Sequence, residues 1–86
     1  MKTDVPTRLY WACRRGMLEL DVLLGNFLQE AYSSLSDDNK TLFVQLLESN
    51  DQDLFVWLTG KETSSNPQFN SMVNMIRQHA KNRHIA

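Results

Sequence analysis

The side chains that most often perform chemistry in proteins are few in this chain. His79 and His84 stand five residues apart near the carboxyl end. This spacing does not place two imidazoles on one helical face, and a metal site would also need carboxylate or cysteine ligands nearby. We therefore expect no metal site, and we interpret both histidines as solvated side chains.

Two interpretations remain for Cys13, the only cysteine. The neighbouring Arg14 and Arg15 would lower the pKa of the thiol and favour a reactive nucleophile. The position of Cys13 beside Leu9 suits a small buried hydrophobic residue, and we favour this interpretation. The three glycines are too scattered for a phosphate-binding loop. We therefore expect no catalytic group and no stably bound cofactor, FAD included; a small enzyme using Cys13 or Glu19 is the weaker alternative.

Two charged residues flank a glycine in CRRGMLE, residues 13–19. Gly16 interrupts a helical pattern, and glycine suits the left-handed conformation that often follows the end of a helix. A residue without a β-carbon also lets the backbone of a partner approach closely. Arg15 and Glu19, separated by this turn, would bond each other or point together toward a partner. A solvated pair contributes only ~0–1 kcal/mol to folding, whereas its worth at a desolvated interface is larger.

The first helix also carries a possible binding face. Arg8, Trp11 and Arg15 occur at i, i+3 and i+7, so they share one helical face. The inward positions are Leu9, Ala12 and Cys13. Tryptophan and arginine are enriched at interface hot spots, so we favour a partner-binding surface. In the alternative interpretation, Trp11 belongs to the core and the arginines are solvated.

The composition is typical of a single globular domain. The chain has 86 residues, of which 42% are hydrophobic and 22% charged, and its net charge is −1. This charge predicts no nucleic-acid binding, and a single cysteine excludes an internal disulfide and fits a reducing compartment. The start MKTDVPTRLY lacks the apolar run of a signal peptide, and no stretch approaches the ~18 apolar residues of a membrane span. We expect a cytoplasmic protein without membrane insertion, monomeric when free.

No segment shows strand alternation, so the sequence predicts an all-α fold, a small five-helix bundle in a single domain, 1–86. The expected helices start near residue 6, at 17, after Ser36, at 50 or 51, and at 67. The first runs to 14 or 15, the second to 32, and the fourth stops at 60. Asp4 or Thr7 would cap the first helix, Ser36 the third, and Asn66, followed by Pro67, the last. Residues 1–6 would form an arm, 61–66 a linker and 82–86 a flexible tail.

Apolar positions with helical periodicity predict the core. In the second helix they are Met17, Leu20, Leu23, Leu24, Phe27, Leu28 and Ala31, with Glu19, Asn26 and Glu30 opposite. In the third they are Leu42, Phe43, Leu46 and Leu47. The fourth contributes Leu54, Trp57 and Leu58, and the last contributes Phe69, Met72, Val73 and Ile76.

Three stretches resemble one known family. WACRRGMLELD, LSDDNK and LLESNDQDLFVWL are similar to segments of the SdhE family of succinate dehydrogenase assembly factors, also called flavinator or FAD assembly factors. The resemblance extends from about Arg8 to the last helix, and only the linker and the tail look idiosyncratic. Its most specific element is the family's RGxxE motif, matched here by Arg15, Gly16 and Glu19.

The resemblance implies a small five-helix protein that is not an enzyme. It implies binding to the flavoprotein subunit of succinate dehydrogenase and of fumarate reductase, where the protein promotes covalent attachment of FAD to a histidine. The central contact would consist of Arg15, Gly16 and Glu19, with Arg8, Trp11 and Arg14 beside them. An antitoxin-like protein-binding module of a toxin–antitoxin pair is the alternative, although the basic DNA-binding segment common in antitoxins is missing. Without a mitochondrial presequence, we expect a bacterial cytoplasm.

Overall fold

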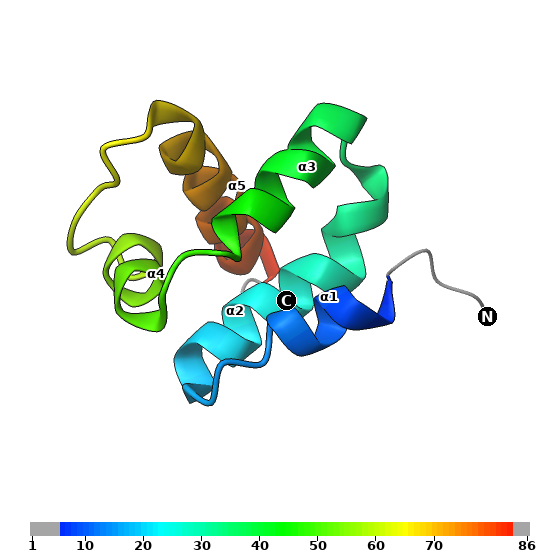
Figure 1. The fold of residues 1–86 in the computed structure, drawn as a ribbon, viewed down its shortest axis with the longest axis horizontal. Helices are drawn as coiled ribbons and strands as arrows, with labels where there is room; N and C mark the ends of the chain where they lie inside the picture. Colours follow the sequence, from blue (N-terminus) through cyan, green and yellow to red (C-terminus); the bar gives the residue numbers. More distant parts are fainter. Residues whose placement is uncertain (1–5, 84–86) are drawn as a thin grey trace.

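The computed structural model describes residues 6–83, in which every regular element is a helix (Figure 1). The elements are α1 (Thr7–Ala12), α2 (Leu18–Ala31), a 3-10 turn η1 (Tyr32–Ser34), α3 (Asp37–Leu46), α4 (Asp51–Leu58) and α5 (Pro67–Arg83). Helix α5 lies between α3 and α4 in Figure 1 and contacts both of them as well as α2. The predicted all-α fold with five helices is confirmed.

Side-chain caps fix the starts of the last three α-helices. The Ser36 hydroxyl accepts a hydrogen bond from the backbone N–H three residues on, at 3.2 Å. The Asn50 amide oxygen does the same at 2.8 Å, and that of Asn66 accepts from the N–H two residues on at 2.9 Å. Each cap satisfies a first-turn amide that has no partner within its helix. The predicted caps Ser36 and Asn66 are therefore confirmed, with Pro67 as the first residue of α5.

Helix α1 is shorter than the prediction. Pro6 occupies its N-cap position without a side-chain cap, so Thr7 is not the cap, and Asp4 lies outside the described residues. The helix ends at Ala12 rather than at residue 14 or 15. The chain leaves the helix because the backbone N–H of Arg15 bonds to a carboxylate of α2, and Gly16 then adopts a φ of +84°. This positive φ confirms the conformation expected of Gly16, which lies four residues past the end of α1.

Helix α2 is also trimmed at both ends. Met17 has an extended backbone, with φ −116° and ψ 114°, so the helix begins at Leu18. Tyr32, predicted as the end of this helix, belongs to the 3-10 turn η1 and is buried. The tighter turn directs the chain toward Ser36 and the start of α3.

The core confirms most of the predicted inward positions. The buried hydrophobic side chains are Leu9, Cys13, Leu20, Leu24, Phe27, Leu28, Tyr32, Phe43, Leu46, Leu47, Leu54, Leu58, Met72, Val73 and Ile76. The rings of Phe27 and Phe43 lie 5.4 Å apart at its centre, which joins α2 to α3. Seven further predicted residues are only partly buried at its edge, namely Ala12, Met17, Leu23, Ala31, Leu42, Trp57 and Phe69.

The carboxyl-terminal helix continues through Arg83, into the segment 82–86 that the sequence predicts as a flexible tail. Its last turn is attached to α2 because the Arg83 guanidinium donates two hydrogen bonds of 2.8 Å to the Glu30 carboxylate. The predicted linker before α5 is held by its own contacts. The Asn70 side chain accepts from the Ser64 N–H and donates to the Ser64 carbonyl, both at 2.8 Å.

Candidate partner-binding surface

The guanidinium of Arg15 is turned inward and joins three segments of the chain. Its Nε donates to Asp51 Oδ1 at 2.7 Å, its Nη2 donates to the Ser49 carbonyl at 2.7 Å, and its Nη1 donates to two further carbonyls at 2.9 Å. Those two carbonyls belong to Ala12, at the end of α1, and Leu47, which caps α3. Only 15% of the Arg15 side chain is exposed. We call this set of contacts the Arg15 clamp.

The Arg15 clamp stabilises the end of α3 and the start of α4. The last carbonyls of a helix have no partner within the helix, and a cation at that end is favoured by the helix dipole. Arg15 supplies hydrogen bonds and a positive charge at the end of α3, and its bond to Asp51 fixes the first turn of α4. Both alternatives considered for Arg15 and Glu19 are therefore wrong, because Arg15 neither pairs with Glu19 nor points outward beside it. Arg15 does not share an outward face with Arg8 and Trp11 either, because α1 ends before reaching it.

Asp21 holds the loop between α1 and α2. Its Oδ1 accepts the backbone N–H of Arg15 at 2.6 Å, and its Oδ2 lies 4.0 Å from Arg14 Nε. The sequence-based reasoning missed both Asp21 and Asp51. Asp21 lies two residues after Glu19, the last residue of the motif, so a search for capping carboxylates would have found it. Asp51 lies 36 residues from Arg15, and no local pattern indicates that contact.

Gly16 is exposed at the surface of this loop. A β-carbon built on it would meet no atom within 4 Å, so the glycine is required by its backbone conformation and not by a neighbour in the fold. A side chain at this position would project away from the protein. A larger residue would therefore strain the turn and stand in the way of anything that approaches it.

Glu19 is exposed in the first turn of α2. Among residues 6–83, none of the ion pairs or side-chain hydrogen bonds involves its carboxylate. Its only evident contribution to the fold is a negative charge near the amino end of the helix dipole, worth about 0.3–1 kcal/mol at low salt. The carboxylate thus remains available to a partner.

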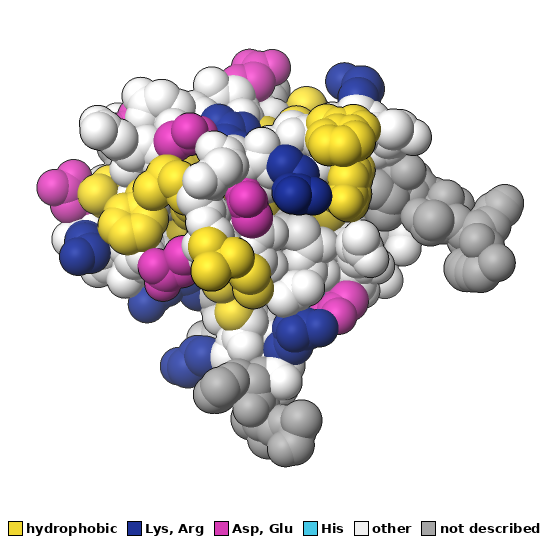
Figure 2. Space-filling view, turned by 90° about the horizontal axis from the view of Figure 1, so that it is seen from below, with side chains coloured by type: hydrophobic (Ala, Val, Ile, Leu, Met, Phe, Trp, Pro, Cys, Tyr) yellow, Lys and Arg dark blue, Asp and Glu magenta, His cyan; other side chains and the backbone are white. Residues whose placement is uncertain are grey.

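Large hydrophobic side chains lie exposed on α1 and α2, the two helices on either side of Gly16. Trp11 is 61% exposed, Leu18 80%, Val22 49% and Tyr10 38%. Figure 2, which views the molecule from below Figure 1, shows separate hydrophobic areas with charged side chains between them. Leu18 and Val22 escaped the sequence-based reasoning. Their spacing of four residues, out of phase with the buried leucines of α2, is the signal that would have found them.

Two arginines lie beside these side chains, Arg8 on α1 and Arg14 two residues after its end. Arg14 lies over the Tyr10 ring, 5.9 Å from its centroid, and its Nη1 donates to the Tyr10 hydroxyl at 3.2 Å. Because Arg14 also faces Asp21, it connects the aromatic side chains of α1 with α2. The Tyr10 and Trp11 rings meet edge to face at 5.1 Å. Arg8 is exposed on the same short helix. The predicted site residues thus form an outer group, with Arg15 behind it.

The groups considered for catalysis do not converge on a site. Burial raises the pKa of the Cys13 thiol to about 12, which opposes the thiolate that a nucleophile needs. His79 is not solvated as predicted, because its Nε2 lies 3.0 Å from Glu30 Oε1 and its ring packs edge-on against Phe27. Among residues 6–83, no group of three or more His, Cys, Asp and Glu residues is placed to hold a metal. His84 lies outside this range.

The helices that the structure describes include none that combines the length and apolar character needed to cross a bilayer.

Comparison with known proteins places this arrangement in a family. A family model described as the flavinator of succinate dehydrogenase matches residues 7–80. The FAD assembly factor SdhE of Shewanella oneidensis is 49% identical over 73 residues, 85% of this chain and 89% of that protein. The FAD assembly factor SdhE of a Serratia species is 42% identical over 83 residues, 96% of this chain and 94% of that protein.

A solved structure agrees with this result. The solution structure of a UPF0350 protein, with 43% sequence identity, superposes with a TM-score of 0.75 and covers 96% of this chain and 89% of that one. At such identity the likeness extends beyond the fold to the sequence. The matched residues 7–80 contain the Arg15 clamp and the exposed residues of α1 and α2 around Glu19, and the chain belongs to the SdhE family of FAD assembly factors.

Proposed function

We propose that this protein binds the flavoprotein subunit of succinate dehydrogenase, and that of fumarate reductase, and promotes covalent attachment of FAD to it in the bacterial cytoplasm. The observation that carries the proposal is Glu19, an exposed carboxylate that the fold leaves unpaired, on a helix that also exposes Leu18 and Val22. The names of the relatives, FAD assembly factor and flavinator of succinate dehydrogenase, support the identity of the client.

In this proposal the protein acts as a monomeric binding partner and not as an enzyme. A protein that binds one client conformation more tightly than another shifts the client population toward that conformation. If the favoured conformation aligns the client histidine with the flavin, the bond forms faster through positioning alone. The reacting groups then belong to the client and its FAD, so the absence of a nucleophile at the exposed surface of α1 and α2 is no obstacle.

The six predicted site residues contribute in two ways in this proposal. Five of them lie outside the core and contact the client directly, namely Arg8, Trp11, Arg14, Gly16 and Glu19. Arg15 does not contact the client and acts through the loop that it holds in place. This loop carries Gly16 and leads into α2, where Glu19 lies. Trp11 supplies apolar area, whereas Glu19 pairs with a cationic or hydrogen-bond donor group of the client.

The test is co-expression of the flavoprotein subunit with variants of this chain, followed by measurement of covalent flavin after denaturation of the client. Glu19→Ala and Trp11→Ala are expected to lower flavinylation strongly, since central interface residues contribute about 2 kcal/mol or more to binding. Thermal unfolding of Glu19→Ala should change by only about 0.5 kcal/mol, as for other surface substitutions.

Asp38→Ala provides the matched control, because Asp38 is an exposed carboxylate in the first turn of α3, as Glu19 is in the first turn of α2. This variant should flavinylate the client as the wild type does. If Glu19→Ala and Trp11→Ala both flavinylate normally while remaining folded, the proposed surface is not where the client binds.

A further inference from the structure

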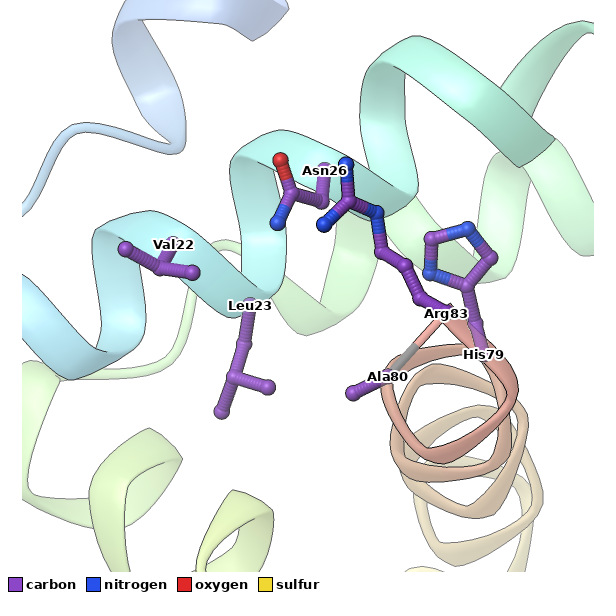
Figure 3. A pocket seen from close by; sticks show the side chains of 6 residues that line it. All are labelled: Val22, Leu23, Asn26, His79, Ala80 and Arg83. Atoms are coloured by element: carbon purple, nitrogen blue, oxygen red, sulfur yellow. The ribbon is translucent and has the colours of Figure 1, made fainter. Parts of the chain in front are cut away.

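Two hollows lie along the line where α2 meets α5. One, of about 260 Å³, is lined by Val22, Leu23, Asn26, His79, Ala80 and Arg83 (Figure 3). The other, of about 360 Å³, includes Glu19, Leu58, Arg77 and Lys81 in its lining. Leu23 and Ala80 line both hollows, so the two adjoin each other, and we refer to them together as the groove. Figure 3 shows Leu23 of α2 and Ala80 of α5 facing the shared space.

The floor and the rim of this groove differ in chemistry. Leu23, Leu58 and Ala80 give the larger hollow an apolar floor. Its rim carries the Glu19 carboxylate on α2 and two cations, Arg77 and Lys81, on α5.

The two rim cations are not neutralised by a charged partner among the described residues, although the Arg77 guanidinium lies against Gly60. In the described part of the chain, neither Arg77 nor Lys81 takes part in an ion pair, whereas Arg83 is held by Glu30. The α5 side of the larger hollow is therefore a positively charged edge over an apolar floor, opposite the Glu19 carboxylate.

We propose that this groove extends the client-binding surface from α2 onto α5 and receives a segment of the flavoprotein that presents an apolar side chain next to a carboxylate. The inference rests on the proposed function and identifies the chemistry of the client segment. The apolar side chain packs over Leu23 and Ala80, and the carboxylate binds Arg77 and Lys81. Glu19 belongs both to the exposed surface of α1 and α2 and to the groove, so the two are continuous.

Charge complementarity favours this occupant. The two exposed cations at this edge attract a carboxylate, whereas a neutral segment would gain no electrostatic attraction from them. A carboxylate matches the planar guanidinium of Arg77 with two parallel hydrogen bonds. The long side chain of Lys81 covers apolar surface with its methylene groups and keeps its ammonium at the rim.

Two substitutions test the groove directly. Ala80→Trp fills the space between α2 and α5, and Lys81→Glu reverses the charge of an exposed rim residue. Ser71→Trp is the control for the first, because nine positions at about 100° per residue place Ser71 on the opposite side of α5. Lys40→Glu on α3 is the control for the second. The affinity of each purified variant for the purified flavoprotein subunit is measured by biolayer interferometry at low and high salt, beside its thermal unfolding.

We expect Ala80→Trp to weaken binding by about tenfold or more, as for loss of a central contact. Lys81→Glu should weaken it several-fold and reduce its salt dependence, because rim charges act mainly on association. Both controls should bind as the wild type does. Lys81→Glu keeps the test informative if Ala80→Trp is unstable, since Lys81 is exposed and outside the core.

The outcomes separate the two proposals. If Glu19→Ala weakens binding while Ala80→Trp and Lys81→Glu bind normally, the groove is not part of the interface and the proposed function stands. If the wild type fails to bind the flavoprotein at all, the proposed function itself fails. If sedimentation shows a dimer that Ala80→Trp dissociates, the groove receives a second copy of this chain, and the inference is overturned.

Discussion

Replacement of Arg15 by alanine is expected to destabilise the fold more than any other change within the RGxxE motif. The variant loses three hydrogen bonds to backbone carbonyls and one to Asp51. Each carbonyl bond is worth about 1 kcal/mol. The ion pair adds little, because 45% of the Asp51 side chain is exposed and solvent screens it. We expect a loss of about 2–4 kcal/mol, a large share of the roughly 4–13 kcal/mol typical of a domain this size.

Such a loss should lower the melting temperature by roughly 10–30 °C, since 1 kcal/mol shifts a small domain by about 4–8 °C. Circular dichroism during heating and urea unfolding measures both quantities. Arg14→Ala is the matched control, because 52% of the Arg14 side chain is exposed and its pairing distance is 4.0 Å; its stability should change by less than about 1 kcal/mol. An Arg15→Ala variant that unfolds within about 0.5 kcal/mol of the wild type would refute the clamp.

Further predictions concern single residues. Gly16→Ala should destabilise the fold by about 1 kcal/mol, because alanine is strained at the positive φ of this position. Gly25→Ala should stabilise the fold by roughly 0.5–1 kcal/mol, because Gly25 lies inside α2 and the added β-carbon would meet nothing within 4 Å. Urea unfolding measures both changes. Cys13, whose pKa is raised by burial to about 12, should react slowly with thiol reagents at pH 8 until urea unfolds the protein; rapid labelling of the folded chain would contradict its burial.

The Arg83 guanidinium holds the pKa of Glu30 below its ordinary value of 4.5. The stabilisation from this pair is therefore complete above about pH 4.5 and is lost as the pH falls through the lower pKa of the folded state. Urea midpoints of Glu30→Gln should depend less on pH than those of the wild type between about pH 5 and pH 3. Equal slopes for the two proteins would show that the pair does not contribute.

Local signals in the sequence were enough to predict the helices and most of the core. Ser36 and Asn66 accept hydrogen bonds from backbone amides two or three residues away. A cap and its partner are therefore both visible in a short stretch of sequence. Helical periodicity likewise predicts which residues of α2 are buried. The same periodicity places Leu18 and Val22 on the outward side, so these two large apolar residues could have been predicted as exposed.

The part that could not be predicted depends on long-range contacts. The arginine of the RGxxE motif has its principal partners in a segment more than 30 residues away, around Asp51, and no periodicity connects the two. Seen in the sequence alone, Arg15 is one of several basic residues beside a tryptophan. The same limit applies to Arg83, whose attachment to Glu30 orders a turn that the composition predicts as a tail.

The position of Arg15 behind the exposed surface has a consequence for the phenotypes of mutations in the RGxxE motif. Under the proposed function, a genetic screen for loss of flavinylation would identify Arg15 and Glu19 substitutions alike, although the two would fail for different reasons. Arg15 variants should be conditional, active in cold-grown cells and inactive in warm ones, and a second mutation that raises overall stability should restore them. Glu19 variants should be defective at every growth temperature and indifferent to such suppressors. One short motif would then contain two classes of allele, which differ in whether the defect depends on growth temperature.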